Sequence, residues 1–387
     1  MFNWSFLQYT FSTILSVFAR IFVNHRQQYD DYYIKDIDGR QVLEKIHITK
    51  PRWNGSRRAP LTFLSTIHDK FFDDCIYKRE ASFDKEVIGA VREMATTAGI
   101  LDLNDKRSVA AFQAFCPAAL LFYPQASVQT MISALSFLNL LWFVDDKLDD
   151  EHLLTSEEAS SLVSCVATTF MKELPAKRNL RWPEVQKYAL AVRDRLLLHR
   201  DEAWVEHFGK TYKSYAEASM IETNMIRQNS SISIADYIDL RMETSGVYPC
   251  QELMAIVYDF NLDDSPEISR ARLLGNRFIS FSNDIFSFEK EFNSNSMNLV
   301  KLHMHKNRCT LNESLEYAIS LLNNAAAEIE EIGHQVETQE EWKKIAILSL
   351  KKMIQGCGIF SRTSRRYCTP SSPFWDVREQ FKLLEKA

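Results

Sequence analysis

Glycine and proline are scarce in this sequence, with ten of each among 387 residues. Because these residues supply the turns between short strands, their scarcity argues against a sandwich or a barrel and favours long helices. The chain contains no internal repeat, no low-complexity tract and no convincing alternation of apolar and polar residues that would predict a strand. Hydrophobic residues make up 46% of the chain. The sequence therefore predicts an all-α protein with a sizeable core.

An excess of positive charge is also missing, since the net charge is −5 and the basic residues are scattered. This pattern does not indicate a nucleic-acid-binding protein. No two cysteines have CxxC spacing, and the seven are Cys75, Cys116, Cys165, Cys250, Cys309, Cys357 and Cys368. An odd set without such spacing predicts free thiols in a reducing compartment, here the cytoplasm, rather than a disulfide or zinc framework.

The N-terminal segment lacks the basic residues that precede the apolar part of a secretory signal. Polar residues interrupt it too often for a membrane span, which needs about 20 mainly apolar residues. Three interpretations stay open: an interfacial or targeting segment with weak membrane association through residues 1–22, an element packed on the domain, and a membrane anchor. We expect residues 1–59 to form an extension, with a turn at Asp36–Gly39, and residues 60–387 to form one α-helical domain.

Helical periodicity dominates the sequence after the extension. The predicted helices cover residues 83–98, 108–122, 127–147, 156–174, 182–204, 205–226, 234–248, 266–291, 311–335 and 340–361. Helices of this length around one core are typical of a bundle.

One predicted helix ends in a cluster of carboxylates. The stretch Leu135–Glu151 begins with nearly continuous apolar residues and then contains Asp145, Asp146, Asp149 and Asp150. Side chains four residues apart share a helix face, so these aspartates stack in pairs. Hard oxygen ligands beside an apolar space suit Mg²⁺, often shared with a substrate phosphate. A solvated charge run at a helix end is the alternative.

A second polar cluster lies in the stretch Asn283–Glu291. Its members Asn283, Ser287 and Glu291 are spaced four apart, so a helix places their oxygens along one edge. Amide, hydroxyl and carboxylate oxygens together can hold one Mg²⁺, and Lys290 beside them suits a phosphate. Read alone, this stretch is more typical of a polar helix end in solvent.

Two further sets of cations complete the pattern. Arg241 lies on a helix that we expect to kink near Ser245–Gly246 and to end at Pro249. Its guanidinium could bind two diphosphate oxygens, and the helix break would expose backbone carbonyls to a cavity. Near the C-terminus, Arg366 and Tyr367 offer a cation and a phenol to the same kind of group. Each set alone is more typical of ordinary surface chemistry than of a site.

In chain order, these motifs resemble those of a known enzyme family. The series DDxxD (Asp145–Asp149), Arg241, NDxxSxxKE (Asn283–Glu291) and Arg366–Tyr367 resembles the class I terpene synthases, in the single-domain form found in microbes and some animals. The resemblance covers roughly residues 60–380 and implies an isoprenoid synthase helical bundle around a central cavity. A DxDD stretch is absent, so cyclisation initiated by protonation is not expected.

The resemblance implies a magnesium-dependent lyase that ionises farnesyl or geranylgeranyl diphosphate, cyclises the carbocation to a sesquiterpene or diterpene, and releases diphosphate. It implies three Mg²⁺ ions, for which Mn²⁺ can substitute. The implied metal ligands are Asp145, Asp149, Asn283, Ser287 and Glu291. The implied residues for the diphosphate and for closing the site are Asp146, Arg241, Lys290, Arg366 and Tyr367. The carboxylates Asp150 and Glu151 directly after DDxxD depart from the pattern of many members.

Aromatic and apolar residues should form the cavity wall, because a carbocation is stabilised by aromatic faces and captured by carboxylates. The wall residues that we predict are Phe112, Phe115, Leu138, Trp142, Ser245, Tyr248, Ile279 and Trp375. For each, ordinary core packing is the alternative.

Two other functions stay open at this point. A prenyl diphosphate synthase would release a longer linear diphosphate, but such enzymes carry two aspartate-rich motifs, and the Asn/Ser/Glu form of the second motif favours cyclisation. A non-catalytic isoprenoid-binding helical scaffold would not need Asn283, Ser287 and Glu291 together. Substrate length, and whether the protein is a monomer or a homodimer, also stay open.

Overall fold

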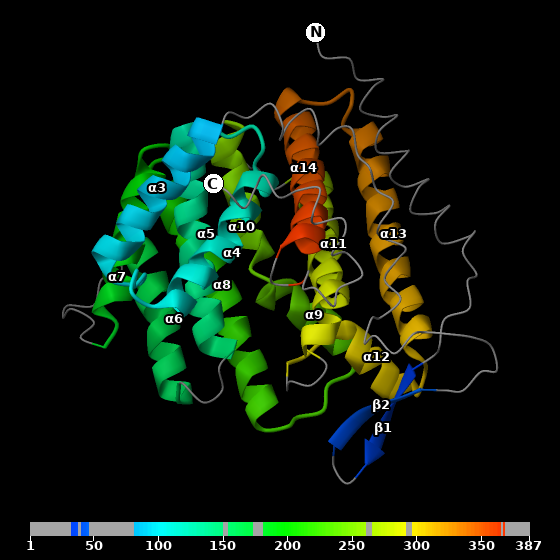
Figure 1. The fold of residues 1–387 in the computed structure, drawn as a ribbon. Helices are drawn as coiled ribbons and strands as arrows, with labels where there is room; N and C mark the ends of the chain where they lie inside the picture. The colour runs from blue at the N-terminus through cyan, green and yellow to red at the C-terminus, as the bar shows by residue number, and fades with distance from the viewer. Residues whose placement is uncertain are drawn as a thin grey trace.

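The fold is a bundle of helices (Figure 1). The computed structural model describes residues 32–37, 40–45, 81–149, 154–172, 181–260, 265–291, 296–364 and 367. Helices α3 to α14 account for most of these residues, which confirms the predicted all-α fold. Residues 1–31 and 46–80 lie outside the described part, so the interpretation of the N-terminal extension and its boundary at residue 59 stays a prediction.

Helix α5 (Val128–Asp149) is the core helix of the bundle. Helices α3 (Ala81–Ala98), α4 (Lys106–Phe122) and α7 (Pro183–Leu197) pack against it. By length and composition α5 is apolar enough to cross a membrane, but 61% of that segment is buried inside the protein. A helix that is apolar on all sides suits the middle of a bundle, so its sequence matches its position.

A second group of helices consists of α6 (Ser156–Phe170), α8 (Glu202–Arg227), α9 (Ile234–Thr244) and α10 (Val247–Val257). Helices α6, α8 and α10 contact α5, and α9 contacts α8. The break between α9 and α10 is at Gly246, whose φ of +67° is a left-handed conformation that glycine adopts without steric cost. A Cβ at this position would also lie 3.1 Å from a methyl group of Leu141 on α5. The break therefore lies directly against the core helix.

The remaining helices form the other side of the bundle. These are α11 (Pro266–Glu291), α12 (Leu299–Asn307), α13 (Leu311–Gln335) and α14 (Glu341–Thr363). Helix α11 contacts both α13 and α14, and α14 also packs on α4. At Gly356 a Cβ would lie 2.1 Å from the backbone oxygen of Leu121, so only glycine allows α14 to approach α4 this closely.

The structure corrects the expected helix boundaries in three places. The boundary between two helices, predicted at residues 204 and 205, lies earlier in the chain, because α8 begins at Glu202. Asp201 caps this helix by accepting a hydrogen bond from the backbone N–H of Trp204. Pro249 does not end a helix: it lies in the first turn of α10, where its missing N–H is tolerated. Helix α12 was not predicted, because its nine residues are too short for a clear periodic pattern.

A β-hairpin precedes the bundle, although the sequence showed no convincing strand. Strand β1 (Tyr32–Ile37) pairs antiparallel with β2 (Arg40–Lys45), and β1 lies against α12 and α13 (Figure 1). The turn expected at Asp36–Gly39 falls at the connection, whose residues 38 and 39 lie outside the described part.

Candidate active site

A cavity of about 390 Å³ brings most of the predicted motifs together. It lies among α5, α8, α9, α10, α11 and α14. Its polar lining includes Asp145, Glu222, Arg241, Asn283, Glu291 and Tyr367. Its apolar lining includes Phe122, Leu138, Leu141, Trp142, Val247, Ile279, Met353 and Phe360. The cavity thus combines an apolar wall with an equally prominent set of charged and polar groups.

The DDxxD motif contributes one carboxylate to this cavity from α5. Asp145 follows Leu138, Leu141 and Trp142 along the lining, and its Oδ1 accepts a hydrogen bond of 3.2 Å from the Tyr215 hydroxyl. Asp146, the next residue, is exposed and does not line the cavity. The two neighbouring aspartates therefore differ in position, because only Asp145 faces the cavity.

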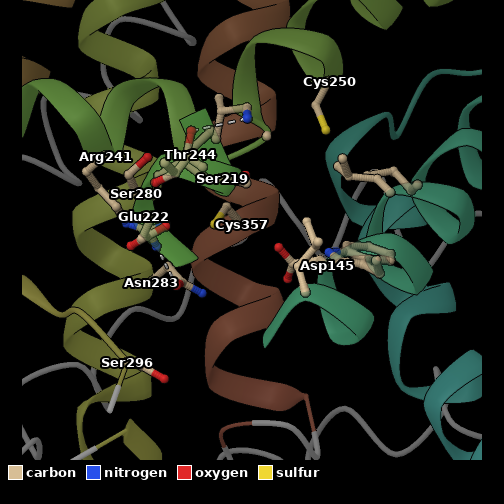
Figure 2. A pocket seen from close by; sticks show the side chains of 18 of the residues that line it. Asp145, Ser219, Glu222, Arg241, Thr244, Cys250, Ser280, Asn283, Ser296 and Cys357 are labelled. Atoms are coloured by element: carbon tan, nitrogen blue, oxygen red, sulfur yellow. Dashed lines mark hydrogen bonds between the residues drawn. The ribbon is translucent and has the colours of Figure 1, made fainter. Parts of the chain in front are cut away.

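The second motif faces Asp145 from α11. Figure 2 shows Asn283 on the side of the cavity opposite Asp145. Asn283 and Glu291 line the cavity, whereas Ser287 is fully buried and is not part of the lining. Asn283 donates a hydrogen bond of 2.6 Å to the Tyr367 hydroxyl, which connects the motif to the C-terminal segment.

Arg241 is held between the two residues that open the second motif. Its Nε donates to Asp284 Oδ1 at 3.0 Å, and its Nη2 donates to Asn283 Oδ1 at 2.9 Å. Burial opposes the charge of Arg241, but the carboxylate of Asp284 beside it raises the pKa well above its usual value. Asp284 is 1% exposed and also accepts hydrogen bonds from the Tyr237 hydroxyl and the backbone N–H of Leu299. Arg241 is thus a permanent cation with a fixed orientation.

The oxygen atoms available here fit a hard divalent cation. Asp145 on one side and Asn283 and Glu291 on the other supply carboxylate and amide oxygens, the ligands that Mg²⁺ prefers. Among the described side chains no group of three or more His, Cys, Asp and Glu residues gathers into a metal cluster.

Glu222 of α8 is a titratable group of the site that the sequence analysis did not identify. It lines the cavity near Arg241 and Asn283 (Figure 2). Burial, together with the carboxylates of Asp284 and Asp145, raises its pKa to about 7. Its signal in the sequence is helix phase, because it follows the buried Tyr212, Tyr215 and Ser219 at intervals of three or four residues.

Replacing Glu222 with glutamine should therefore make stability depend less on pH. A carboxyl whose pKa is raised in the folded state favours folding less and less as pH rises from its unfolded value to its folded value of about 7. Glu222→Gln should exceed the unfolding free energy of the wild type by less than about 1 kcal/mol at pH 5 and by much more at pH 8. Because one pKa unit corresponds to about 1.4 kcal/mol, the difference at pH 8 should reach about 3 kcal/mol.

Urea unfolding of the metal-free protein at pH 5 to 8 would measure this difference. Glu217→Gln is the matched control, since Glu217 is an exposed residue of the same helix. If the unfolding free energies of Glu222→Gln and the wild type differ by the same amount at pH 5 and pH 8, the raised pKa of Glu222 is contradicted.

Aromatic rings form part of the wall. The rings of Trp142 and Phe360 are nearly parallel, at 16°, with centroids 6.4 Å apart, and the Tyr367 ring meets Phe360 edge-on at 6.2 Å. Phe115 stacks on Trp142 at 4.1 Å but is not part of the lining. It supports the Trp142 ring rather than facing the cavity. Phe360, like Phe122, was not among the predicted wall residues.

Two cysteines also line the cavity, one from α10 and one from α14. Burial raises the pKa of both Cys250 and Cys357 to about 12. Both therefore remain neutral thiols at physiological pH, which matters because a thiolate would be a strong nucleophile. The five cysteines in the described part of the chain are free.

The other predicted wall and diphosphate residues have three outcomes: some line the cavity, some do not, and some lie outside the described residues. Leu138, Trp142, Ser245 and Ile279 line the cavity, whereas Phe112 and Tyr248 do not. Phe112 is buried in the main core. The Tyr248 ring lies beside Arg272, with 5.9 Å between the ring centroid and the guanidinium carbon. The side chains of Asp149 and Lys290, and the whole of Arg366 and Trp375, lie outside the described residues, so their roles stay predictions.

Comparison with known proteins gives consistent results. Residues 136–328 match the family model described as terpene synthase family 2, C-terminal metal binding. Terpene synthase 1 of Cavenderia fasciculata is 24% identical over 302 residues, 73% of this chain and 88% of that protein. A (+)-T-muurolol synthase of Roseiflexus castenholzii, named as cyclising (2E,6E)-farnesyl diphosphate, is 23% identical over 205 residues, 51% of this chain and 62% of that protein.

Solved structures show the same fold. The 2-methylisoborneol synthase of Streptomyces coelicolor, in complex with Mg²⁺ and 2-fluoroneryl diphosphate, aligns with a TM-score of 0.67 at 14% identity, over 75% of this chain and 94% of that chain. The linalool/nerolidol synthase of Streptomyces clavuligerus, in complex with 2-fluorogeranyl diphosphate, aligns with a TM-score of 0.63 at 14% identity, over 72% and 98% of the two chains.

Proposed function

This chain belongs to the class I terpene synthases, and we propose that it ionises farnesyl diphosphate with bound magnesium ions and cyclises the carbocation to a sesquiterpene. One observation carries the proposal: Asp145 of the first motif faces Asn283 of the second motif and Arg241 of α9 across a cavity that also has an apolar wall. This arrangement binds an anionic group at one place and encloses a hydrocarbon chain beside it. The farnesyl chain length is supported by the name of the Roseiflexus relative.

The magnesium site draws on residues from both sides of the cavity. Asp145, Asn283 and Glu291 supply oxygens at the lining, and we assign Asp149 and Ser287 to the same set. Bound Mg²⁺ supplies Lewis acidity, which stabilises the charge that develops on the departing diphosphate. We propose three ions, with Mn²⁺ able to replace Mg²⁺.

The protein's own cations should bind the diphosphate. Arg241 presents a planar fork of donors that suits two phosphate oxygens, and Tyr367 adds a hydroxyl at the cavity lining. We assign Lys290 and Arg366 to the same group on their place in the motifs. Because Arg241 is anchored by Asp284, it reaches the substrate without a large loss of side-chain entropy.

The wall residues should hold and protect the carbocation. The faces of Trp142 and Phe360 can stabilise a positive charge by about 0.5–2 kcal/mol each once water is excluded. Cys250 and Cys357 offer neutral thiols rather than thiolates to the cavity, so they do not add an anionic nucleophile. The wall thus delays capture of the cation until the chain has cyclised.

Product analysis tests the function directly. The protein is incubated with Mg²⁺ and, separately, with geranyl, farnesyl and geranylgeranyl diphosphate, and products are identified by gas chromatography–mass spectrometry. We expect a cyclic hydrocarbon or alcohol from farnesyl diphosphate, and none when the metal is chelated. A longer linear diphosphate formed with added isopentenyl diphosphate would instead show a prenyltransferase, and no diphosphate release from any substrate would show a binding scaffold.

We also infer a cytoplasmic protein, because the described cysteines are free thiols. Weak membrane association through residues 1–22 and a monomeric or homodimeric state remain predictions.

A further inference from the structure

Asn298 joins the second motif to the helix that follows it. It is the N-cap of α12 and is 1% exposed. Its side-chain oxygen accepts hydrogen bonds from the backbone N–H groups of Val300 at 2.9 Å and Lys301 at 3.3 Å. This half of the amide satisfies two donors that the first turn of any helix leaves without an intrahelical partner.

The other half of the same amide points back to α11. Asn298 Nδ2 donates to the backbone oxygen of Asp284 at 2.7 Å and to Glu291 Oε2 at 3.0 Å. It also lies 3.5 Å from Ser287 Oγ. One buried side chain therefore contacts two of the three predicted ligands of the second motif and caps the next helix.

Capping alone does not require an amide at this position. Serine, threonine and aspartate cap helices about as well as asparagine, and the cap uses only an acceptor oxygen. The donor is needed only for the contacts with Asp284, Ser287 and Glu291. Because Asn298 is buried, water cannot take over these contacts when the amide is removed.

We propose that Asn298 is a positioning residue for the metal site, whose amide fixes the orientation of the Glu291 carboxylate and the Ser287 hydroxyl. The inference rests on the proposed function, since it assigns the magnesium ligands from that function. Groups that hydrogen-bond to metal ligands typically change metal affinity 10–100-fold when they are removed.

The test compares Asn298→Ser with Asp105→Ser. Serine keeps a capping oxygen but has no amide donor that reaches Glu291, so the variant separates the two halves of the side chain. Asp105 is the exposed N-cap of α4, where its carboxylate accepts a hydrogen bond from the backbone N–H of Arg107. Asp105→Ser is therefore a matched change of cap far from the motif in sequence. Should Asn298→Ser not fold by circular dichroism, Asn298→Thr replaces it, because threonine is also a capping residue.

The readout is Mn²⁺ binding to the folded protein at 25 °C, followed by electron paramagnetic resonance with inorganic diphosphate present. It needs no turnover, and a merely structural cap would leave it unchanged. We expect Asn298→Ser to weaken Mn²⁺ binding at least about tenfold and Asp105→Ser to leave it unchanged. Asn298→Ser and Glu291→Gln should weaken the binding of the same Mn²⁺ ion.

Two outcomes would overturn the inference, and they differ in what they imply. Unchanged Mn²⁺ binding in Asn298→Ser, with weakened binding in Glu291→Gln, would show that Asn298 only caps α12 and would leave the proposed function intact. A wild-type protein that binds no Mn²⁺ with diphosphate would overturn the magnesium-dependent function and the role of Asn298 together.

Discussion

Replacing Asp145 with asparagine should reduce turnover by more than about a hundredfold while leaving the fold intact. Loss of a group that merely supports a metal ligand costs about 10–100-fold, so loss of a ligand charge should cost more. The amide oxygen of asparagine can still accept the hydrogen bond that the Tyr215 hydroxyl donates to Asp145. Local structure should therefore persist, and the loss should fall on metal-dependent ionisation.

Steady-state kinetics with varied Mg²⁺ would measure this effect, with circular dichroism to verify the fold. Asp239→Asn is the matched control, because Asp239 is exposed on α9 and undergoes the same loss of one charge. Turnover in Asp145→Asn within about threefold of the control would remove Asp145 from the metal site.

Replacing Asp284 with asparagine should lower the free energy of unfolding by about 3–5 kcal/mol, the usual cost of removing one partner of a buried ion pair. Asp284 is 1% exposed, and its ion-pair partner Arg241 is 16% exposed. The neutral amide would leave the Arg241 charge without its nearest carboxylate in a poorly solvated place. It would also disturb the hydrogen bonds from Tyr237 and the backbone of Leu299.

Urea unfolding of the metal-free protein would give this free energy, with Asp239→Asn again as the control. A double variant, Arg241→Met with Asp284→Leu, separates stability from catalysis. Removing both charges should recover part of the lost stability, because apolar replacement of a buried pair is often neutral. It should not recover turnover, because the diphosphate would lose the arginine. A loss below about 1 kcal/mol in Asp284→Asn would show that solvent already screens the pair.

The fold was predictable from the sequence wherever one physical signal dominated. Long apolar periodicity located α5, α11 and α13 to within a few residues. The break at Gly246 was predictable because a glycine interrupts a helical pattern there. Helix α10, helix α12 and the β-hairpin were missed. Pro249 was expected to end a helix where α10 in fact begins, and the other two elements are short and carry little periodic signal. An Asp-Gly pair at residues 38 and 39 is a known hairpin signal and was interpreted only as a turn.

The candidate site divides in the same way. Spacing along single helices was enough to propose Asp145, Asn283 and Glu291, because side chains on one helix face are neighbours whatever the rest of the chain does. Spacing could not identify Glu222, Asp284 or Asn298 as partners of these residues. These three residues act through contacts between segments that are distant in the sequence. No local sequence pattern shows how close such segments lie in the folded protein.

By itself, the sequence determined the helical class and the residue types and spacing of the two motifs, since these depend on residue type and helical period. Only the tertiary structure decided which side chains face the cavity. It turned Asp145 inward and Asp146 outward, placed Phe115 behind Trp142, and brought Phe360 of α14 to the wall. The reason is packing: a cavity wall is made where helices distant in sequence meet, and small contacts such as that of Gly356 with Leu121 set how closely they approach.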